Sequence, residues 1–130
     1  MEFTVPDPEV SAAWYQNVLG FTLRADHRRG KVGVIVLEHP SGLVLGFWKH
    51  TPEATSDRFD EFRTGLDHVA FEVSTRDDLD DWVAHFRALG VEHSQPVDIG
   101  PYGLVLTFRD PDNIQLEMYW DKRRESLEGV

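Results

Sequence analysis

The sequence predicts an α+β fold made of two paired β-α-β-β-β modules. Two observations support this prediction. The halves of the chain align with each other: residues 3–5 fall on residues 71–73 at an offset of 68, and residues 34–37 fall on residues 105–108 at an offset of 71. Each half also has one helix-type pattern followed by β-rich runs and turn residues. The repeated order of elements therefore predicts two modules of the same design.

The first module begins with a short predicted strand at residues 3–5. A helix follows, because Asp7 offers an N-cap, Pro8 suits the first helical position and Gly20 suits the C-terminal cap. The predicted inward stripe, which follows helical spacing, consists of Val10, Ala13, Trp14, Asn17 and Val18. Three further strands are predicted at residues 21–25, 32–37 and 43–48, with a tight turn at 40–42 before the last of them.

The second module repeats this order, beginning with a strand at residues 67–73. Thr75 and Asp78 resemble a capping box with Asp in place of Glu, and Gly90 closes the helix. The predicted helical stripe consists of Leu79, Trp82, Val83, Phe86 and Leu89, and both Trp14 and Trp82 are predicted to be core residues. Strands are predicted at residues 91–93, 104–108 and 114–120, with a turn at 111–113. The predicted domain organisation is module one at 1–49, a connector at 50–64, module two at 65–120 and a polar tail at 121–130.

Two predicted strands of the second module each have one face with side chains that could bind a metal or a substrate. In the first, Val69, Phe71 and Val73 share one face, and His68, Ala70 and Glu72 share the other. In the last, Ile114, Leu116 and Met118 alternate with Gln115, Glu117 and Tyr119. Because an unpaired buried carboxylate is costly, we expect Glu117 to meet His68 and hold a divalent metal. The alternatives are a strand-end His bonded to a backbone carbonyl and an edge Glu facing water.

Composition limits the functional classes. The chain has 130 residues, 41% of them hydrophobic, which is enough for one compact core. Its net charge of −10 argues against nucleic acid as a partner and is compatible with binding a cation or small molecule, or with solubility alone. With no cysteine there is no disulfide, thiolate nucleophile or sulfur-based zinc site. The absence of a signal peptide and of a long apolar run predicts a cytoplasmic protein without a membrane partner.

Three motifs resemble the vicinal oxygen chelate superfamily, which includes glyoxalase I, extradiol dioxygenases, and fosfomycin- and bleomycin-resistance proteins. They are AWYQNVLGF at 13–21, GLDHVAF at 65–71 and FRDPDNIQLE at 108–117, and the resemblance covers about residues 3–120. It implies sheets curled into a half-open barrel (the glyoxalase-like fold), helices outside, a metal in the concavity and a homodimer. The motifs are more specific for the fold than for the reaction.

Metal ligands in this family come from the first and fourth strands of each module. The resemblance places His68 and Glu117 at these positions in module two. In module one the fourth-strand position is Gly46, which has no side chain, and the first-strand position falls one residue before Met1. Either an upstream segment with the missing ligand precedes this chain, or the metal site is degenerate. A restored His would give a two-His-one-carboxylate arrangement suited to Fe(II) or Mn(II).

Other residues are candidates for contact with a substrate. Glu72 and Gln115 share the predicted face of the ligands, although exposed strand positions explain them equally well. Trp48 and Tyr119 lie two residues after Gly46 and Glu117 and could stack on a planar molecule. Tyr102 lies in the segment 100–103, which is predicted to be a lid or a plain turn. His50, at the end of a strand, is the reserve metal ligand.

Two functions are consistent with these features. The first is a metal-dependent lyase, isomerase or dioxygenase, in which Fe, Mn, Ni or Zn binds adjacent oxygens of a small-molecule substrate and Glu117 is catalytic. The alternative is a metal-free, bleomycin-resistance-like protein that needs no cofactor. There Trp48, Tyr102 and Tyr119, together with the acidic surface, would hold a cationic or aromatic molecule.

Overall fold

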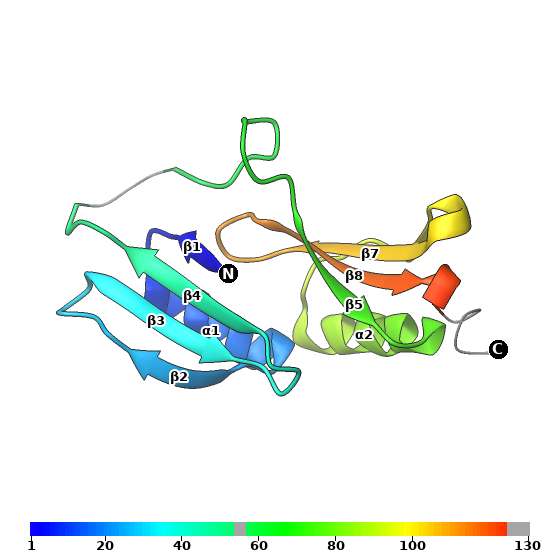
Figure 1. The fold of residues 1–130 in the computed structure, drawn as a ribbon, viewed down its shortest axis with the longest axis horizontal. Helices are drawn as coiled ribbons and strands as arrows, with labels where there is room; N and C mark the ends of the chain where they lie inside the picture. Colours follow the sequence, from blue (N-terminus) through cyan, green and yellow to red (C-terminus); the bar gives the residue numbers. More distant parts are fainter. Residues whose placement is uncertain (54–56, 125–130) are drawn as a thin grey trace. The chain divides into compact units, whose positions relative to one another are not determined.

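Each half of the chain folds into one open four-stranded sheet with one helix packed against it (Figure 1). The computed structural model describes residues 1–53 and 57–124. The chain divides into a first unit, Met1–Phe59 with Asp110–Asp112, and a second unit, Asp60–Arg109 with Asn113–Val130. The predicted α+β class and the repeated β-α-β-β-β order are therefore confirmed.

The first unit has the strand order β1-β4-β3-β2. Its elements are β1 (Glu2–Thr4), α1 (Pro8–Leu19), β2 (Thr22–Asp26), β3 (Gly33–Glu38) and β4 (Val44–Lys49). Strand β1 runs parallel to β4, and the other pairs are antiparallel. In this register Glu2 lies opposite Gly46.

The second unit has the equivalent order β5-β8-β7-β6. Its elements are β5 (Val69–Val73), α2 (Arg76–Leu89), β6 (Val97–Asp98), the short 3₁₀ helix η1 (Gly100–Tyr102), β7 (Gly103–Arg109) and β8 (Gln115–Asp121). Strand β5 runs parallel to β8, with Ala70 opposite Glu117. The two units therefore share one topology, as the internal repeat predicts.

The predicted helix caps are confirmed. The Asp7 side chain accepts a hydrogen bond from the Glu9 backbone N–H at 3.0 Å. Thr75 and Asp78 form the reciprocal capping box. Gly20 ends α1 with a φ of 78°, a left-handed conformation that glycine adopts without steric cost.

The predicted inward stripe of α1 is wrong in most of its positions. Val10 is 53% exposed, whereas the buried positions are Pro8, Ser11, Ala12, Tyr15, Val18 and Leu19. Two polar residues can be buried there because both are hydrogen-bonded: the Tyr15 hydroxyl donates to Asp110 at 2.7 Å, and the Ser11 hydroxyl donates to Asp112 at 2.6 Å. Burial and the Asp110 carboxylate also raise the pKa of Tyr15.

Two other predictions need correction. Trp14 and Trp82 are half-buried and do not belong to the fully buried core. Residues 91–93 do not form a strand; His93 makes an isolated bridge to Phe108, and the pairing with β7 resumes only at Val97–Asp98. Ser94 explains part of this interruption, because its side-chain oxygen accepts the Thr107 backbone N–H at 3.0 Å.

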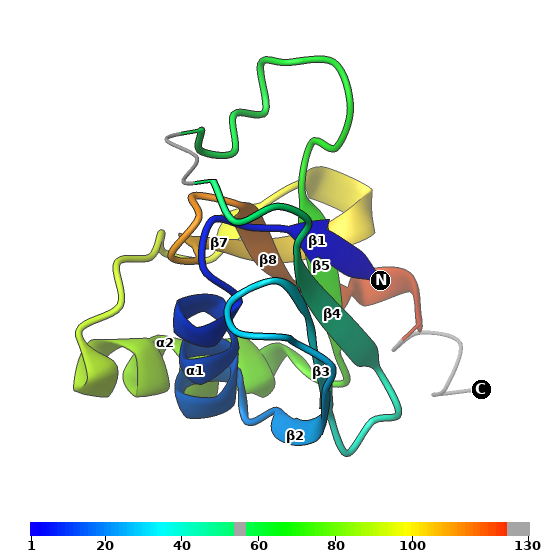
Figure 2. The ribbon, with the colours of Figure 1, turned by 90° about the vertical axis from the view of Figure 1, so that its left-hand side faces the viewer.

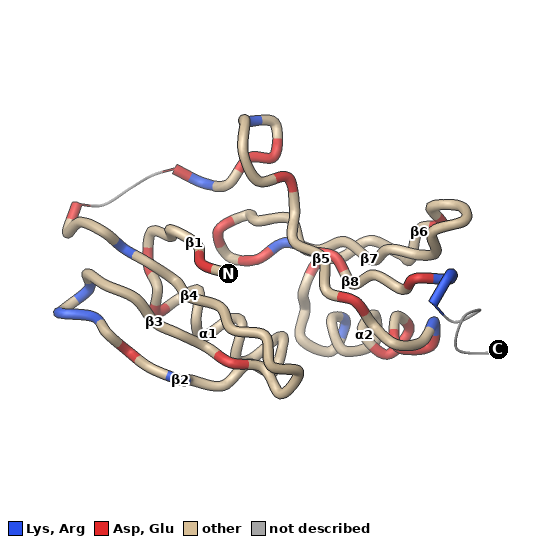
Figure 3. Tube along the Cα trace, viewed as in Figure 1, with Lys and Arg blue, Asp and Glu red and all other residues tan. Residues whose placement is uncertain are grey.

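Each unit has its own aromatic core between helix and sheet. The rings of Tyr15 and Phe47 are 4.8 Å apart in the first unit, and those of Phe86 and Phe108 are 4.5 Å apart in the second. The residues that lead into β5 form a loop without helix or strand (Figure 2). Acidic residues occur on both units, including a run along α2 (Figure 3). No helix in the described ranges is long and apolar enough to cross a membrane.

Candidate metal centre

The second sheet has one face against α2 and one open face. Val69, Leu116 and Met118 are buried on the helix side. Glu72 is exposed on the open face, and Glu117 and Tyr119 are half-buried there. The alternation predicted for these strands is therefore present, and polar side chains gather on the face that no helix of this unit covers.

The structure brings His68 and Glu117 together on this face. The imidazole Nε2 lies 3.4 Å from Glu117 Oε2, and the side chains are 37% and 14% exposed. Their proximity follows from the sheet register. Ala70, two residues after His68, lies opposite Glu117 in the parallel β5–β8 pair, so both side chains point to the same side.

Asp67 is the nearer of the two carboxylates that face the His68 ring. Its carboxylate oxygen lies 2.7 Å from His68 Nδ1. An ionised carboxylate can only accept, so a neutral His68 that donates from Nδ1 to this nearer carboxylate has its Nε2 lone pair on the Glu117 side. Two lone pairs that face each other favour a positive charge between them, which a proton or a metal ion can supply. Asp67 was missed in the sequence, although its position next to a candidate ligand was a usable signal.

The geometry fits two ligands of one metal ion. Ligands bound at about 2.1 Å in a tetrahedral arrangement lie about 3.4 Å apart, which matches the separation between Nε2 and Oε2. Imidazole and carboxylate suit Fe, Mn, Ni or Zn. Within residues 1–53 and 57–124, no group of three or more His, Cys, Asp or Glu side chains is arranged to hold a metal. His68 and Glu117 would therefore leave coordination positions for water or substrate oxygens.

The other oxygen of Glu117 faces Gln115. The Gln115 amide Nε2 donates to Glu117 Oε1 at 3.5 Å, and its Oε1 accepts from Arg109 at 3.2 Å. Arg109 also forms a two-bond ion pair with Glu61, at 2.7 and 2.9 Å. Hydrogen bonds from Arg109 lower the pKa of Glu61 to about 2, and the same contact raises the pKa of Arg109. The role of Arg109 and Glu61 was missed because they are 48 residues apart in the chain.

The remaining candidates of the second unit have partners of their own. Glu72 lies 3.1 Å from Nε of Arg124. The Tyr119 hydroxyl donates to the Tyr102 carbonyl at 2.9 Å, and Arg123 lies over the Tyr102 ring at 4.9 Å. The ring of Tyr102 thus faces a cation of its own chain. Tyr102 lies in the short 3₁₀ helix η1, where the sequence predicts a lid or a plain turn.

The first unit has a different arrangement at the equivalent positions. A Cβ atom at Gly46 would lie 2.9 Å from both Cγ and Oε1 of Glu2, so the Glu2 side chain lies over the glycine. Glu2 Oε1 accepts from the Trp48 indole at 3.1 Å. Trp48 stacks on His50 with 5.3 Å between ring centroids, and His50 Nε2 lies 3.3 Å from Thr4 Oγ1. Glu2 was missed, although strand alternation could have placed it opposite Gly46.

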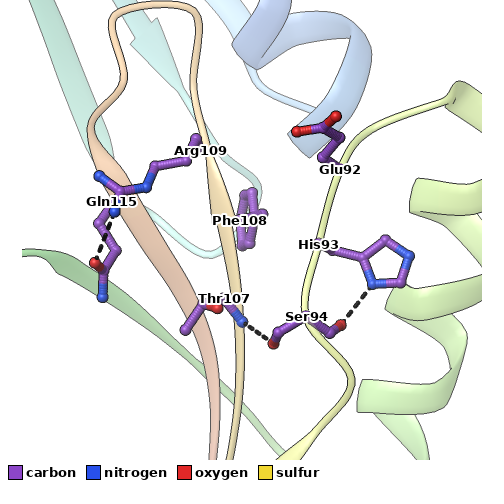
Figure 4. A pocket seen from close by; sticks show the side chains of 7 residues that line it. All are labelled: Glu92, His93, Ser94, Thr107, Phe108, Arg109 and Gln115. Atoms are coloured by element: carbon purple, nitrogen blue, oxygen red, sulfur yellow. Dashed lines mark hydrogen bonds between the residues drawn. The ribbon is translucent and has the colours of Figure 1, made fainter. Parts of the chain in front are cut away.

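A pocket of about 320 Å³ lies beside β7, but its polar groups do not converge (Figure 4). It is lined by Glu92, His93, Ser94, Thr107, Phe108, Arg109 and Gln115. His93 turns toward α2, and its Nδ1 lies 2.6 Å from the Ser94 carbonyl oxygen. Arg109 and Gln115 lie together on the other side of the strands. The open face with His68 and Glu117 is therefore the stronger candidate site.

Comparisons with known proteins identify relatives along nearly the whole chain. A family model, the Glyoxalase/Bleomycin resistance protein/Dioxygenase superfamily, matches residues 1–118. The uncharacterized protein YaeR of Escherichia coli K12 is 33% identical in a match 119 residues long, and the match covers 87% of this chain and 87% of that protein. A solved glyoxylase/bleomycin resistance protein/dioxygenase domain from Frankia sp. EAN1pec is 31% identical, with 94% of both chains covered and a TM-score of 0.82.

Two more distant structures show the same fold. The fosfomycin resistance protein FosX from Listeria monocytogenes is 19% identical, with 99% of this chain and 94% of that chain covered and a TM-score of 0.71. A lactoylglutathione lyase from Agrobacterium tumefaciens is 15% identical, with 92% and 90% covered and a TM-score of 0.69. The fold is thus shared by proteins named for different activities.

Proposed function

The chain belongs to the Glyoxalase/Bleomycin resistance protein/Dioxygenase superfamily, and from this premise we propose that it is a metal-dependent enzyme. Its substrate would be a small molecule that binds the metal through adjacent oxygens, and its reaction that of a lyase, isomerase or dioxygenase. The observation that carries the proposal is the 3.4 Å separation between His68 Nε2 and Glu117 Oε2, with the Nδ1 hydrogen of His68 bonded to Asp67.

Each residue has a defined part in this proposal. His68 and Glu117 would hold the metal ion, and Asp67 keeps the Nε2 lone pair available for it. The metal, when bound, would act as a Lewis acid that stabilises negative charge on the substrate oxygens. Glu117 is the candidate proton acceptor, because a metal bound through Oε2 would leave Oε1 uncoordinated; Oε1 accepts a hydrogen bond from the Gln115 amide at 3.5 Å.

Binding of the substrate would use the neighbouring open face. Gln115, Glu72 and Tyr119 project from this face, and Tyr102 is the other proposed contact in this unit. A homodimer and a cytoplasmic location complete the proposal, the former supported by the family resemblance alone. Metal identity remains one of Fe, Mn, Ni or Zn, because imidazole and carboxylate ligands suit all four.

One observation favours a second candidate function, a metal-free binding protein. The parallel stack of Trp48 and His50 lies beside the Glu2 carboxylate on the first unit. Flat rings next to an anionic group can hold a cationic aromatic molecule. This arrangement uses no residue of the candidate metal centre, so the two functions can be separated by mutation.

The test is metal content and affinity. Purified protein, metal-stripped and reloaded with Co(II), should bind one equivalent, and the His68→Ala and Glu117→Ala variants should lose it. His93→Ala is the matched control, because His93 bonds to a backbone carbonyl and should leave binding unchanged. Binding that survives in both ligand variants, or no binding by the natural chain, would overturn the proposal. In the second case, binding of a cationic aromatic dye should be measured with and without Trp48→Ala.

A further inference from the structure

Six side chains form one continuous network on the second unit. In spatial order they are Asp67, His68, Glu117, Gln115, Arg109 and Glu61. The first three belong to the candidate metal centre. We propose that Arg109 and Glu61 are positioning residues that orient Gln115, so that Gln115 holds one oxygen of Glu117 and leaves the other directed at His68. This inference rests on the proposed function, because it assigns a purpose to the orientation of a metal ligand.

The orientation of Gln115 follows from the chemistry of its neighbours. A primary amide has an acceptor end and a donor end, while a guanidinium can only donate. The bond from Arg109 therefore fixes Gln115 Oε1 on the Arg109 side, at 3.2 Å, and turns Nε2 toward Glu117. The reversed amide would direct an oxygen at the Glu117 carboxylate, which is repulsive. Figure 4 shows the side chains of Arg109 and Gln115 side by side.

Arg109 is itself held in one geometry. It lies directly opposite Gln115 in the β7–β8 pair. Besides Gln115, its NH1 and NH2 groups donate to both carboxylate oxygens of Glu61 and to the Asn113 carbonyl at 3.0 Å. A planar guanidinium with bonds to three different partners has little freedom to rotate. Loss of Glu61 would release two of the four hydrogen bonds.

Glu61 comes from the connector, where Phe59 also donates its backbone N–H to the Asp112 carbonyl at 3.0 Å. Its neighbours Phe62 and Arg63 donate their backbone N–H groups to Asp60, within the same turn. Phe62 is 92% exposed, so apolar burial does not hold this segment. Within residues 60–66, Glu61 forms an ion pair with Arg109 of β7, and the negative charge of Asp60 also helps to raise the pKa of that guanidinium. The position of the connector and the orientation of Glu117 are therefore linked.

The competing explanation is that the Glu61–Arg109 ion pair only attaches the connector to β7 and stabilises the fold. If the pair is only structural, its removal should lower the stability of the protein and nothing else. If it positions Gln115, its removal should also change the affinity and the spectrum of the bound metal. Outer-shell partners of metal ligands typically change metal affinity by about 10–100-fold. The two explanations therefore differ in a spectroscopic and binding readout, not merely in a melting temperature.

The experiment compares Co(II) binding in Glu61→Gln, Arg109→Gln and the natural chain. We expect a loss of affinity of about tenfold or more in both variants, with a changed visible spectrum of the bound Co(II). Glu61→Asp, which keeps the charge, should recover part of the affinity. Asp121→Asn is the matched control, because Asp121 forms a similar two-bond pair with Arg123 outside the network. Affinities and spectra identical to this control would overturn the inference.

A second measurement needs no metal. The side-chain amide signals of Gln115 can be followed by nitrogen-15 NMR in metal-free protein. They should shift in Glu61→Gln and Arg109→Gln but not in Asp121→Asn, and an unchanged amide in both variants would contradict the inference. If the natural chain bound no Co(II) while the amide shifted as expected, the proposed metal function would fail and the orientation of Glu117 by this network would stand.

Discussion

The open face of each sheet has one carboxylate in the equivalent pair of facing residues. In the first unit this carboxylate is on the first strand of the module, and in the second unit it is on the last strand. In the second unit Glu117 on β8 lies opposite Ala70 on β5. In the first unit Gly46 on β4 lies opposite Glu2 on β1. Glu117 approaches an imidazole, whereas Glu2 lies over the glycine and accepts the Trp48 indole hydrogen. The two units therefore share one strand order but carry different polar side chains on their open faces.

The reason lies in the two faces of each sheet. The helix-facing positions, such as Leu45 and Phe47 in the first unit and Leu116 and Met118 in the second, are buried and maintain the strand register. Substitutions on the open face do not disturb that packing. Function can therefore differ between two copies of one fold.

The largest expected effect tests whether Glu117 or Glu2 binds the metal ion. Glu117→Gln keeps the shape of the side chain but removes its charge, and Co(II) affinity should fall by more than about 100-fold, since even outer-shell partners are worth about 10–100-fold. Glu2→Gln, the equivalent change in the first unit, should leave affinity unchanged. Isothermal titration measures both. An equal loss in Glu2→Gln would contradict the division of roles between the two units.

A smaller effect tests the packing of Glu2 on Gly46. Gly46→Ala forces the Glu2 side chain to move and to give up its hydrogen bond from Trp48, so we expect a loss of about 1–2 kcal/mol in the free energy of unfolding. In a Glu2→Ala background the same change should be neutral or stabilising by up to about 1 kcal/mol, because alanine suits a strand better than glycine. Urea unfolding of the four proteins gives the coupling energy. Additive effects would show that the two side chains do not compete for one space.

The smallest effect concerns pH and compares one ion pair from each unit. Hydrogen bonds from arginine lower the pKa of both Asp26 and Glu61 to about 2. A lowered carboxyl pKa contributes stability that is present above the unfolded value, 4.5 for Glu61, and is lost as pH falls toward about 2. We therefore expect the Glu61–Arg109 contact to persist at pH 4. The NMR signals of the Arg109 NH1 and NH2 groups, which donate to Glu61, measure this.

The matched change in the first unit sharpens this comparison. Asp26 pairs with Arg28, two residues away, so Asp26→Asn should affect only a local turn. Glu61→Gln should speed hydrogen exchange throughout residues 60–66, because Glu61 links that segment to β7. Equal exchange in the two variants would show that the Glu61 pair does not hold the connector.

Local sequence signals predicted much of the fold. The capping box of Thr75 and Asp78 lies within four consecutive residues, and the strand faces follow from alternation alone. The same alternation put His68 and Glu117 on one face, and the structure brings them together. The two side chains come within 3.4 Å because β5, the first strand of the module, pairs in parallel with β8, its last strand. The family resemblance implies this pairing, because it places metal ligands on the first and fourth strands of a module.

Signals between distant residues could not be read in this way. The buried face of α1 was misjudged because Tyr15 and Ser11 find partners 95 and 101 residues away. Burial of a hydroxyl depends on those partners and not on its own helix. The covering of Gly46 by Glu2 likewise depends on a neighbouring strand, and the network through Arg109 depends on a connector residue 48 positions earlier.

The hydrogen bonds of Tyr15 and Ser11 also have a consequence for the order of folding. Their partners, Asp110 and Asp112, belong to the first unit but are made after residues 60–109 of the second. During synthesis on the ribosome, the hydroxyls of Tyr15 and Ser11 therefore have no partner until residues 110–112 have been made. Contacts of such high sequence separation slow folding. A nascent chain ending at residue 59 should therefore remain dynamic and sensitive to proteases, and the two modules should acquire their stability together.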